Sequence, residues 1–202
     1  MKALLFRLLW LPLMACGAWA QTPVQNMDIS FLFGPLSVKA QTVPGTTITL
    51  QHYTGVSALI VYGYQLEHTK AGSLWLEMFP ASSSTLQPRT PALPGSVDIS
   101  PAFITPGLRF MVPVHPRFSF YGVAGGGAGF FSYVVQTPAA SPTVLVNSTV
   151  HGVADVGGGA DFRFNVRFSL RGEVRDYITG RGLSGVEGRN HVVIGGGLVF
   201  HF

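Results

Sequence analysis

The chain has 202 residues, a length that suits a single domain. Its residues are 47% hydrophobic and 12% aromatic but only 11% charged, whereas about 25% charged residues are typical of soluble domains. The formal net charge of +4 is too small an excess to indicate a nucleic-acid partner. Beyond the N-terminus no apolar run of about 18 residues could form a membrane-spanning helix, so the hydrophobic residues are dispersed among polar ones.

Residues 1–20 have the order of a secretory signal peptide. Basic residues come first, an apolar run covers residues 8–15, and small residues precede a cleavage point ahead of Gln21. The single cysteine, Cys16, follows an apolar triplet like that of a lipoprotein processing site, and lipid attachment there is the alternative. With ordinary cleavage the remaining domain, 21–202, has no cysteine and hence no disulfide or catalytic thiol.

From residue 26 onward, apolar and polar residues alternate in eight segments, and each alternation predicts a strand. In chain order the segments are 26–37, 56–67, 73–79, 102–112, 117–133, 151–164, 166–177 and 190–202. Long connections rich in Pro, Ser and Thr, such as residues 80–101, alternate with short turns. Pro106 interrupts the fourth segment, which predicts either a bulge there or a strand that begins later.

The last segment, NHVVIGGGLVFHF, has one apolar face and one milder face. The apolar face carries Val192, Ile194, Gly196, Leu198, Phe200 and Phe202, and the other face carries histidines, glycines and valines. Such a strand separates a hydrophobic environment from a more polar one. Periodicity alone does not decide which face points into a barrel or sandwich.

With this closing strand, the signal peptide and the alternation of long and short connections, the chain resembles the small OmpA-type eight-stranded outer-membrane β-barrel family. The resemblance implies an all-β, eight-stranded antiparallel up-and-down transmembrane β-barrel in the cell outer membrane, with short periplasmic turns and long extracellular loops. It also implies that Leu198, Phe200 and Phe202 form the signal read by the barrel-assembly machinery. The alternative is a soluble periplasmic lipocalin-like barrel with its faces inverted.

If the apolar faces meet lipid, the opposite faces fill the lumen, and their charged residues are expected to form a salt-bridge network. These residues are Asp28, Glu67, Glu77, Arg109, Asp155, Asp161, Arg163, Arg167, Arg171, Glu173 and Arg175. A tight turn at Asn165 would place Asp155 opposite Arg175. Aromatic residues gather near both ends of the strands, with Phe130, Phe131 and Tyr177 among those expected at the outer rim.

The sequence predicts no catalytic, cofactor or metal site. None of the six histidines is followed two positions later by a serine, the arrangement of outer-membrane lipid A deacylases. The histidines are too scattered to indicate a metal. Glycine triplets begin at Gly125, Gly157 and Gly195, but they lack the helix and the Lys-Ser/Thr of phosphate-binding loops and are read as parts of strands.

These observations predict a non-enzymatic outer-membrane protein with a structural or surface-interaction role. A narrow, porin-like channel for small solutes is the alternative. The expected surroundings are outer-membrane lipid and lipopolysaccharide, whose phosphates could contact Arg89, Arg181 and Arg189 in the long loops. Replacing all three arginines with Ser should then raise sensitivity to detergent or polymyxin. The protein is expected to be a monomer.

Overall fold

The computed structural model describes residues 25–38, 41–42, 49–50, 53–85, 96–136, 144–181 and 187–202. The predicted signal peptide with Cys16 lies outside the described residues, as does Arg89. Nearly all of the described chain is β-strand. Within it, no helix is long and apolar enough to cross a membrane.

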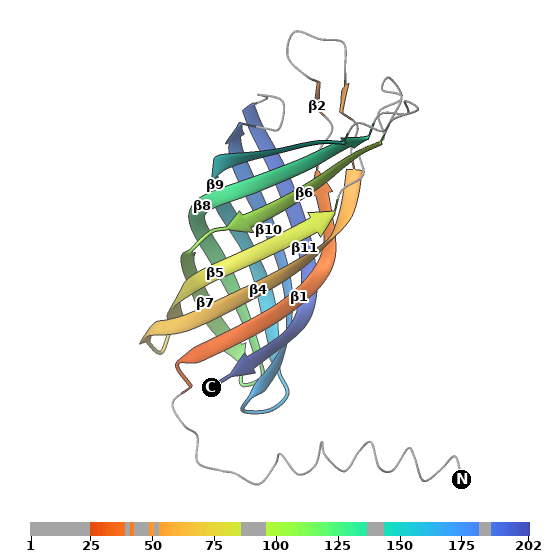
Figure 1. Ribbon diagram of the computed structural model, residues 1–202. Coiled ribbons are helices and arrows are strands. Elements are labelled where there is room, and N and C mark those ends of the chain that lie inside the picture. The colour runs from red at the N-terminus through yellow and green to blue at the C-terminus, as the bar shows by residue number, and fades with distance from the viewer. Residues whose placement is uncertain are drawn as a thin grey trace, which may run out of the picture.

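The strands form one closed antiparallel ring with eight positions (Figure 1). Around the ring they are β1 (Met27–Val38), β4 (Tyr53–His68), β5 (Ser73–Thr85), β6 (Ser96–Ile104) together with β7 (Gly107–His115), β8 (Phe118–Gln136), β9 (Val144–Arg163), β10 (Phe168–Arg181) and β11 (Glu187–His201). Two short strands, β2 (Gln41–Thr42) and β3 (Thr49–Leu50), pair with each other outside the ring. The ring closes between β1 and β11, where Met27 and Phe202 exchange backbone hydrogen bonds of 3.2 and 3.0 Å.

Short connections lie together at one end of the barrel, which we name the turn end (Figure 1). They are residues 69–72, 116–117 and 164–167, and both the start of β1 and the end of β11 lie beside them. The longer connections leave the opposite end, the loop end. This arrangement is the up-and-down barrel that the sequence predicts, and the expected fold class is confirmed.

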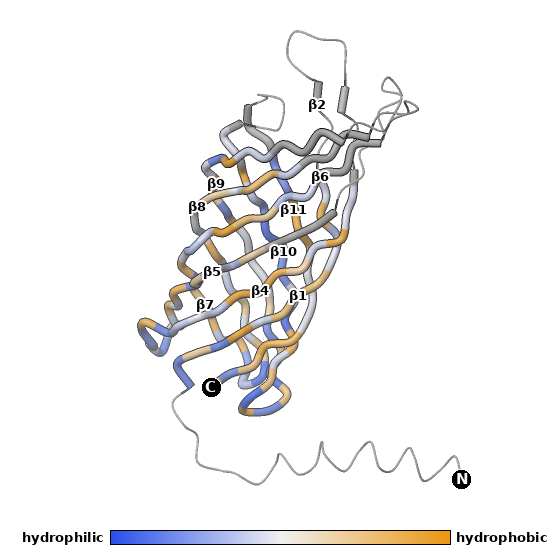
Figure 2. Tube along the Cα trace, in the orientation of Figure 1, coloured by the Kyte–Doolittle hydropathy of each residue, from blue (hydrophilic) through white to orange (hydrophobic). Residues whose placement is uncertain are grey.

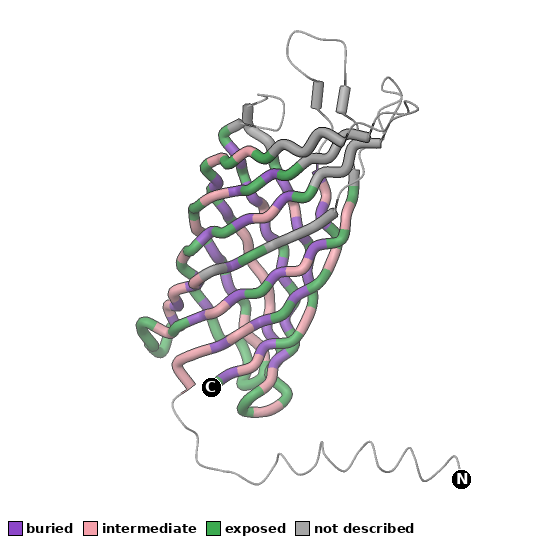
Figure 3. The backbone as a smooth tube through the Cα atoms, viewed as in Figure 1, coloured by how far each residue is buried: buried purple, intermediate pink, exposed green. Residues whose placement is uncertain are grey.

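Along most of each strand, hydrophobic residues alternate with more polar ones (Figure 2), and exposed residues alternate with buried ones (Figure 3). Phe31, Leu108 and Leu198 on the apolar faces are 44%, 48% and 52% exposed. Asp28 and Arg109, on the opposite faces, are fully buried. A soluble barrel would need the reverse, because its apolar residues must avoid water. The lipocalin-like alternative is therefore wrong, and the outer surface is the one that a lipid bilayer requires.

Pro106 breaks the fourth predicted strand in two. β6 ends at Ile104 and β7 begins at Gly107, and both pair with β8 in a single register. On the other side, Thr105 donates a backbone hydrogen bond of 3.4 Å to the carbonyl of Pro80. The register with β5 shifts by one residue across this point, as a bulge requires. Pro80 and Pro106 cannot donate backbone hydrogen bonds, and both lie at this one interruption of the hydrogen-bond ladder.

Several strands extend further toward the loop end than the sequence predicts. Much of the expected loop 80–101 is strand, since β5 runs to Thr85 and β6 starts at Ser96. The expected loop 136–149 is similarly shortened by β9, which starts at Val144. The extensions of β5 and β9 show no apolar alternation, and that of β6 alternates only over residues 96–100, so the periodicity there is too short to separate a strand from a loop.

The register between β9 and β10 differs from the expected one by two residues. Asp155 pairs with Tyr177, and Asp161 pairs with Arg171, so Arg175 is not directly opposite Asp155. The reason is a wider turn, in which the Asn165 side chain accepts hydrogen bonds from the backbone N–H groups of Arg167 and Phe168. A slip of two residues leaves every side chain on its expected face.

Candidate functional site

The middle of the lumen is filled by a set of buried charged side chains, which we name the ion-pair cluster. Five strands contribute to it, and each of these residues is at most 5% exposed. Its members are Asp28, Glu77, Arg109, Asp155, Asp161, Arg171, Glu173 and Arg175. All of them lie on the inward faces because strand alternation places every second residue there.

Two arginines bind the carboxylates nearer the turn end. Arg171 holds Asp161 through two hydrogen bonds of 2.7 Å, from Nε and Nη2, in a bidentate arrangement. Arg109 binds Asp28 at 2.5 Å, and its other terminal nitrogen lies 3.4 Å from Glu77. Asp28 also lies 3.4 Å from Arg171, so it joins the two arginines. Bidentate arginine–carboxylate pairs fix geometry as well as charge.

Arg175 binds three carboxylates in the other half of the cluster. Its nitrogens lie 2.8 Å from Glu77, 3.1 Å from Asp155 and 2.8 Å from Glu173. Two neutral side chains complete this half, since Thr105 donates to Asp155 at 2.5 Å and Tyr121 donates to Glu173 at 2.6 Å. The expected pairing of Asp155 with Arg175 therefore exists, although it is diagonal between the strands.

An aromatic layer covers the cluster on its turn-end side. Trp75, Met111 and Tyr121 form a buried apolar group. The Arg109 guanidinium lies 5.0 Å from the Trp75 ring centre, and Arg171 lies 5.0 Å from the Tyr121 ring centre. These are cation–π contacts, which attach the layer to the ion pairs above it.

A second apolar layer covers the cluster on its loop-end side. It contains Leu36, Val38, Phe103, Phe131, Val153, Tyr177 and Val193. Phe103 stacks on Tyr177 with 4.4 Å between ring centres, and Phe131 packs edge-on against Phe103. Phe131 and Tyr177 are thus inside the barrel, and their assignment to an outer aromatic rim is wrong. Phe130 and Phe131 are adjacent, so only one of them can point outward, and it is Phe130.

Three of the charged residues expected in the lumen network are exposed and form no ion pair within the described part of the chain. A bulge in the pairing of β4 with β5 between Gln65 and Glu67 breaks the alternation and leaves Glu67 exposed. Arg163 is the last residue of β9 and lies at the mouth of the barrel. Arg167 belongs to the turn before β10. Their inclusion in the network is therefore corrected.

The other predicted residues lie at the two ends. Leu198, Phe200 and Phe202 lie on the outward face of β11, where ring centres of Phe200 and Phe202 are 5.7 Å apart. Arg181 ends β10 and Arg189 lies near the start of β11, both at the loop end, and their side chains are outside the described part. Recognition by the assembly machinery and contact with lipopolysaccharide remain predictions.

The lumen also brings together a serine and a histidine that are 32 residues apart. Ser169 Oγ and His201 Nε2 are 2.8 Å apart, and both residues are at most 2% exposed. A search for the His-x-Ser motif could not find this pair, because it comes from two strands. His201 Nδ1 has no hydrogen-bond partner among the described residues. A catalytic triad needs a third group at that nitrogen.

No set of His, Cys, Asp or Glu side chains in the described ranges is arranged to hold a metal ion. Each carboxylate of the ion-pair cluster lies within 3.5 Å of an arginine nitrogen, so the arginines take the place that a cation would occupy. The three glycine triplets lie within β8, β9 and β11 and are not phosphate-binding loops. The chemistry of the lumen is electrostatic pairing.

No known family model matches the chain, and no curated protein matches it significantly. Several solved structures are similar to it in shape. Neisserial surface protein A (NspA) superposes with a TM-score of 0.56 at 12% identity, over 87% of this chain and 97% of that one. The outer membrane protease OmpT from Escherichia coli gives 0.51 at 11% identity, over 92% and 99% of the two chains.

Ail, the attachment invasion locus protein of Yersinia pestis, gives a TM-score of 0.49 at 15% identity, over 87% of this chain and 99% of that chain. At such identities the likeness concerns the fold alone. The closed ring, the apolar outer surface and the buried charges agree with it independently. By its fold and by the directions of its side chains, the chain is a closed eight-stranded antiparallel β-barrel with the fold of the small outer-membrane barrels.

Proposed function

We propose that the protein is a closed, non-enzymatic barrel with a structural or surface-interaction role in the outer membrane. The observation that carries this proposal is the filled lumen. The ion-pair cluster lies between two apolar layers, and together they occupy the interior from the level of Trp75 to that of Phe131. An eight-stranded barrel has room for side chains and little else.

The turn end would face the periplasm and the loop end the exterior, since short turns are periplasmic in such barrels. The long loops are then the parts that meet the surroundings, with lipopolysaccharide phosphates as the expected partners of Arg89, Arg181 and Arg189. Leu198, Phe200 and Phe202 would serve the assembly machinery during insertion. Deleting Phe202 should lower the amount of barrel in the outer membrane, and an unchanged amount would contradict that role.

A narrow channel is the competing function. Conduction would require a continuous aqueous path, and every level of the lumen centre is occupied by bonded or packed side chains. Opening such a path would break several buried ion pairs at once, and each costs several kcal/mol once one partner is removed. The filled lumen therefore favours the structural or surface-interaction role over the channel.

The first prediction concerns conductance. The purified protein, inserted into planar bilayers in 1 M KCl, should give no stable conductance steps, because the cluster and the two apolar layers block the lumen. A porin inserted in the same bilayers serves as the positive control. Reproducible steps of one size, seen with independent preparations, would contradict the proposal and favour the channel.

The second prediction concerns the contribution of Arg175 to stability. Arg175→Met leaves three carboxylates without their shared guanidinium, so unfolding by urea from lipid vesicles should become easier by about 3–5 kcal/mol. Arg167→Met, an exposed turn residue, is the matched control and should change stability by less than about 0.5 kcal/mol. The double variant Arg175→Met, Glu173→Gln should recover part of the loss. Equal stabilities of Arg175→Met and the control would refute the cluster's structural role.

The third prediction concerns the Ser169–His201 pair. Ser169 is 1% exposed and His201 has no orienting partner among the described residues, so the serine should not be activated. A fluorophosphonate, which loses fluoride when an activated serine attacks its phosphorus, should leave the protein's mass unchanged in mass spectrometry. Labelling of Ser169 that disappears in His201→Gln would show a hydrolase-type nucleophile and overturn the non-enzymatic assignment.

A further inference from the structure

A cavity of about 320 Å³ opens at the turn end of the barrel. At about 30 Å³ per molecule of liquid water, this is room for roughly ten waters, or for one small organic molecule. Its lining comes mainly from the ends of six strands of the ring and from the turns between β7 and β8 and between β9 and β10. It lies below the aromatic layer, and Asp161 is the one member of the ion-pair cluster in its lining.

The wall of the cavity is cationic. Two arginines, Arg117 and Arg163, line it. Neither arginine forms an ion pair within the residues that the structure describes. The one acid in the lining, Asp161, is neutralised by its bidentate pair with Arg171. The cavity therefore presents two unpaired guanidinium groups to whatever enters it.

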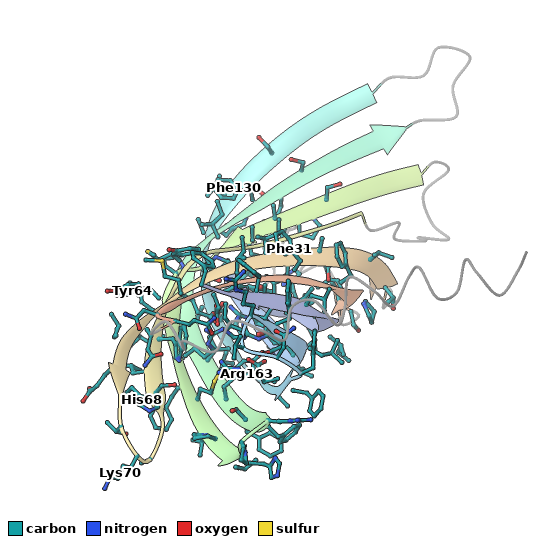
Figure 4. All side chains as sticks on the ribbon, turned by 90° about the horizontal axis from the view of Figure 1, so that it is seen from below. Phe31, Tyr64, His68, Lys70, Phe130 and Arg163 are labelled. Atoms are coloured by element: carbon teal, nitrogen blue, oxygen red, sulfur yellow. The ribbon has the colours of Figure 1, made fainter. Side chains whose placement is uncertain are left out.

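The basic residues at the turn end fall into two sets: those that line the cavity and those on the surrounding rim. Figure 4 views the barrel from below, with Arg163 among the side chains within the ring and Lys70 at the tip of the β4–β5 turn. Lys70 and Arg167 carry charge at the same end but do not line the cavity. They provide controls for general attraction by the basic rim.

The floor of the cavity contains an apolar patch, beside the buried polar residues Ser73, Asp161 and Ser169. Trp75 and Met111, which are 4% and 9% exposed, line its inner end. The Trp75 indole nitrogen donates a 2.8 Å hydrogen bond to Ser73, and Arg109 stacks above the ring, so the indole is held in place. A ligand could rest an apolar body on this floor but could not pass beyond it.

These features together select one class of ligand. Paired arginines suit a carboxylate, which accepts bidentate charge-assisted hydrogen bonds. The indole and thioether floor suits an aromatic or aliphatic body. We propose that the cavity is a binding site for small organic carboxylates that enter from the turn end with the carboxylate held between Arg117 and Arg163. This site goes beyond the structural role of the barrel, because it is built at the end away from the long loops.

The chain provides its own reporter for this site. From Gln21 onward Trp75 is the only tryptophan, and it forms part of the floor. The experiment titrates the purified protein with benzoate to about 10 mM and follows Trp75 emission, with isothermal calorimetry in parallel. Benzamide, which is neutral, tests whether binding needs a charge on the ligand. Benzylamine, a cation, tests whether that charge must be negative. Inorganic phosphate, an anion without an apolar body, tests whether binding needs the aromatic ring.

We expect benzoate to give a saturable response, and benzamide to bind about tenfold more weakly, since hydrogen bonds to charged groups are the stronger ones. Benzylamine and phosphate should bind more weakly still. Arg163→Gln and Arg117→Gln should each weaken benzoate binding by about tenfold. Arg167→Gln and Lys70→Gln should leave it unchanged.

Each of the following results would overturn the proposal. They are the absence of a saturable benzoate signal in both measurements, equal affinity for benzamide or phosphate, and unchanged benzoate affinity in the Arg163→Gln, Arg117→Gln double variant. A loss of affinity as large in Arg167→Gln as in Arg163→Gln would also overturn it, because general attraction by the rim would then explain the binding.

Discussion

The structure depends on one constraint: a chain that turns its apolar faces outward must satisfy all its polar groups inside. The backbone meets this constraint by closing the ring between β1 and β11, so that the first and last strands of the sheet pair with each other. The side chains meet it through arginines. Arg175 alone binds three carboxylates from three different strands, and Arg109 and Arg171 share Asp28.

The same constraint explains why the lumen is layered. Bare charges in a narrow interior would need water, but apolar layers on both sides of the ion-pair cluster exclude it. Tyr121 belongs to both parts, since its ring lies under Arg171 and its hydroxyl donates to Glu173. Exclusion of water strengthens the ion pairs, and the ion pairs in turn hold the aromatic rings. A closed barrel follows, with a cavity at its turn end.

Strand alternation allowed much of this to be predicted. The direction of each side chain follows from a period of two, so eight of the eleven charged residues expected in the lumen lie in the cluster, Asp28 and Arg175 among them. The predicted lumen position of Glu67 is wrong because a bulge resets the alternation, and a bulge has no clear signature in a single sequence. The predicted place of Phe131 in the outer aromatic rim is wrong because Phe130 and Phe131 are adjacent in one strand and cannot both point outward.

Features that depend on register were harder to predict. The width of the turn at Asn165 decides which residues of β9 and β10 face each other, and the predicted turn was too tight. Ser169 and His201 meet only because β10 and β11 are neighbours in a fixed register. The same holds for the cavity, whose arginines come from β9 and from the turn before β8. No spacing along the chain could have indicated it.

The most direct test of the whole account asks which face meets lipid. Trp75 points into the lumen, whereas Leu108 on the neighbouring strand β7 is 48% exposed on the outer surface. Tryptophan fluorescence should be measured in vesicles of acyl-chain-brominated lipid, which quenches only indoles that touch it. The account predicts little quenching of Trp75 in the native protein and strong quenching in the variant Trp75→Phe, Leu108→Trp. Strong quenching of Trp75 with none in the variant would mean that the faces are inverted.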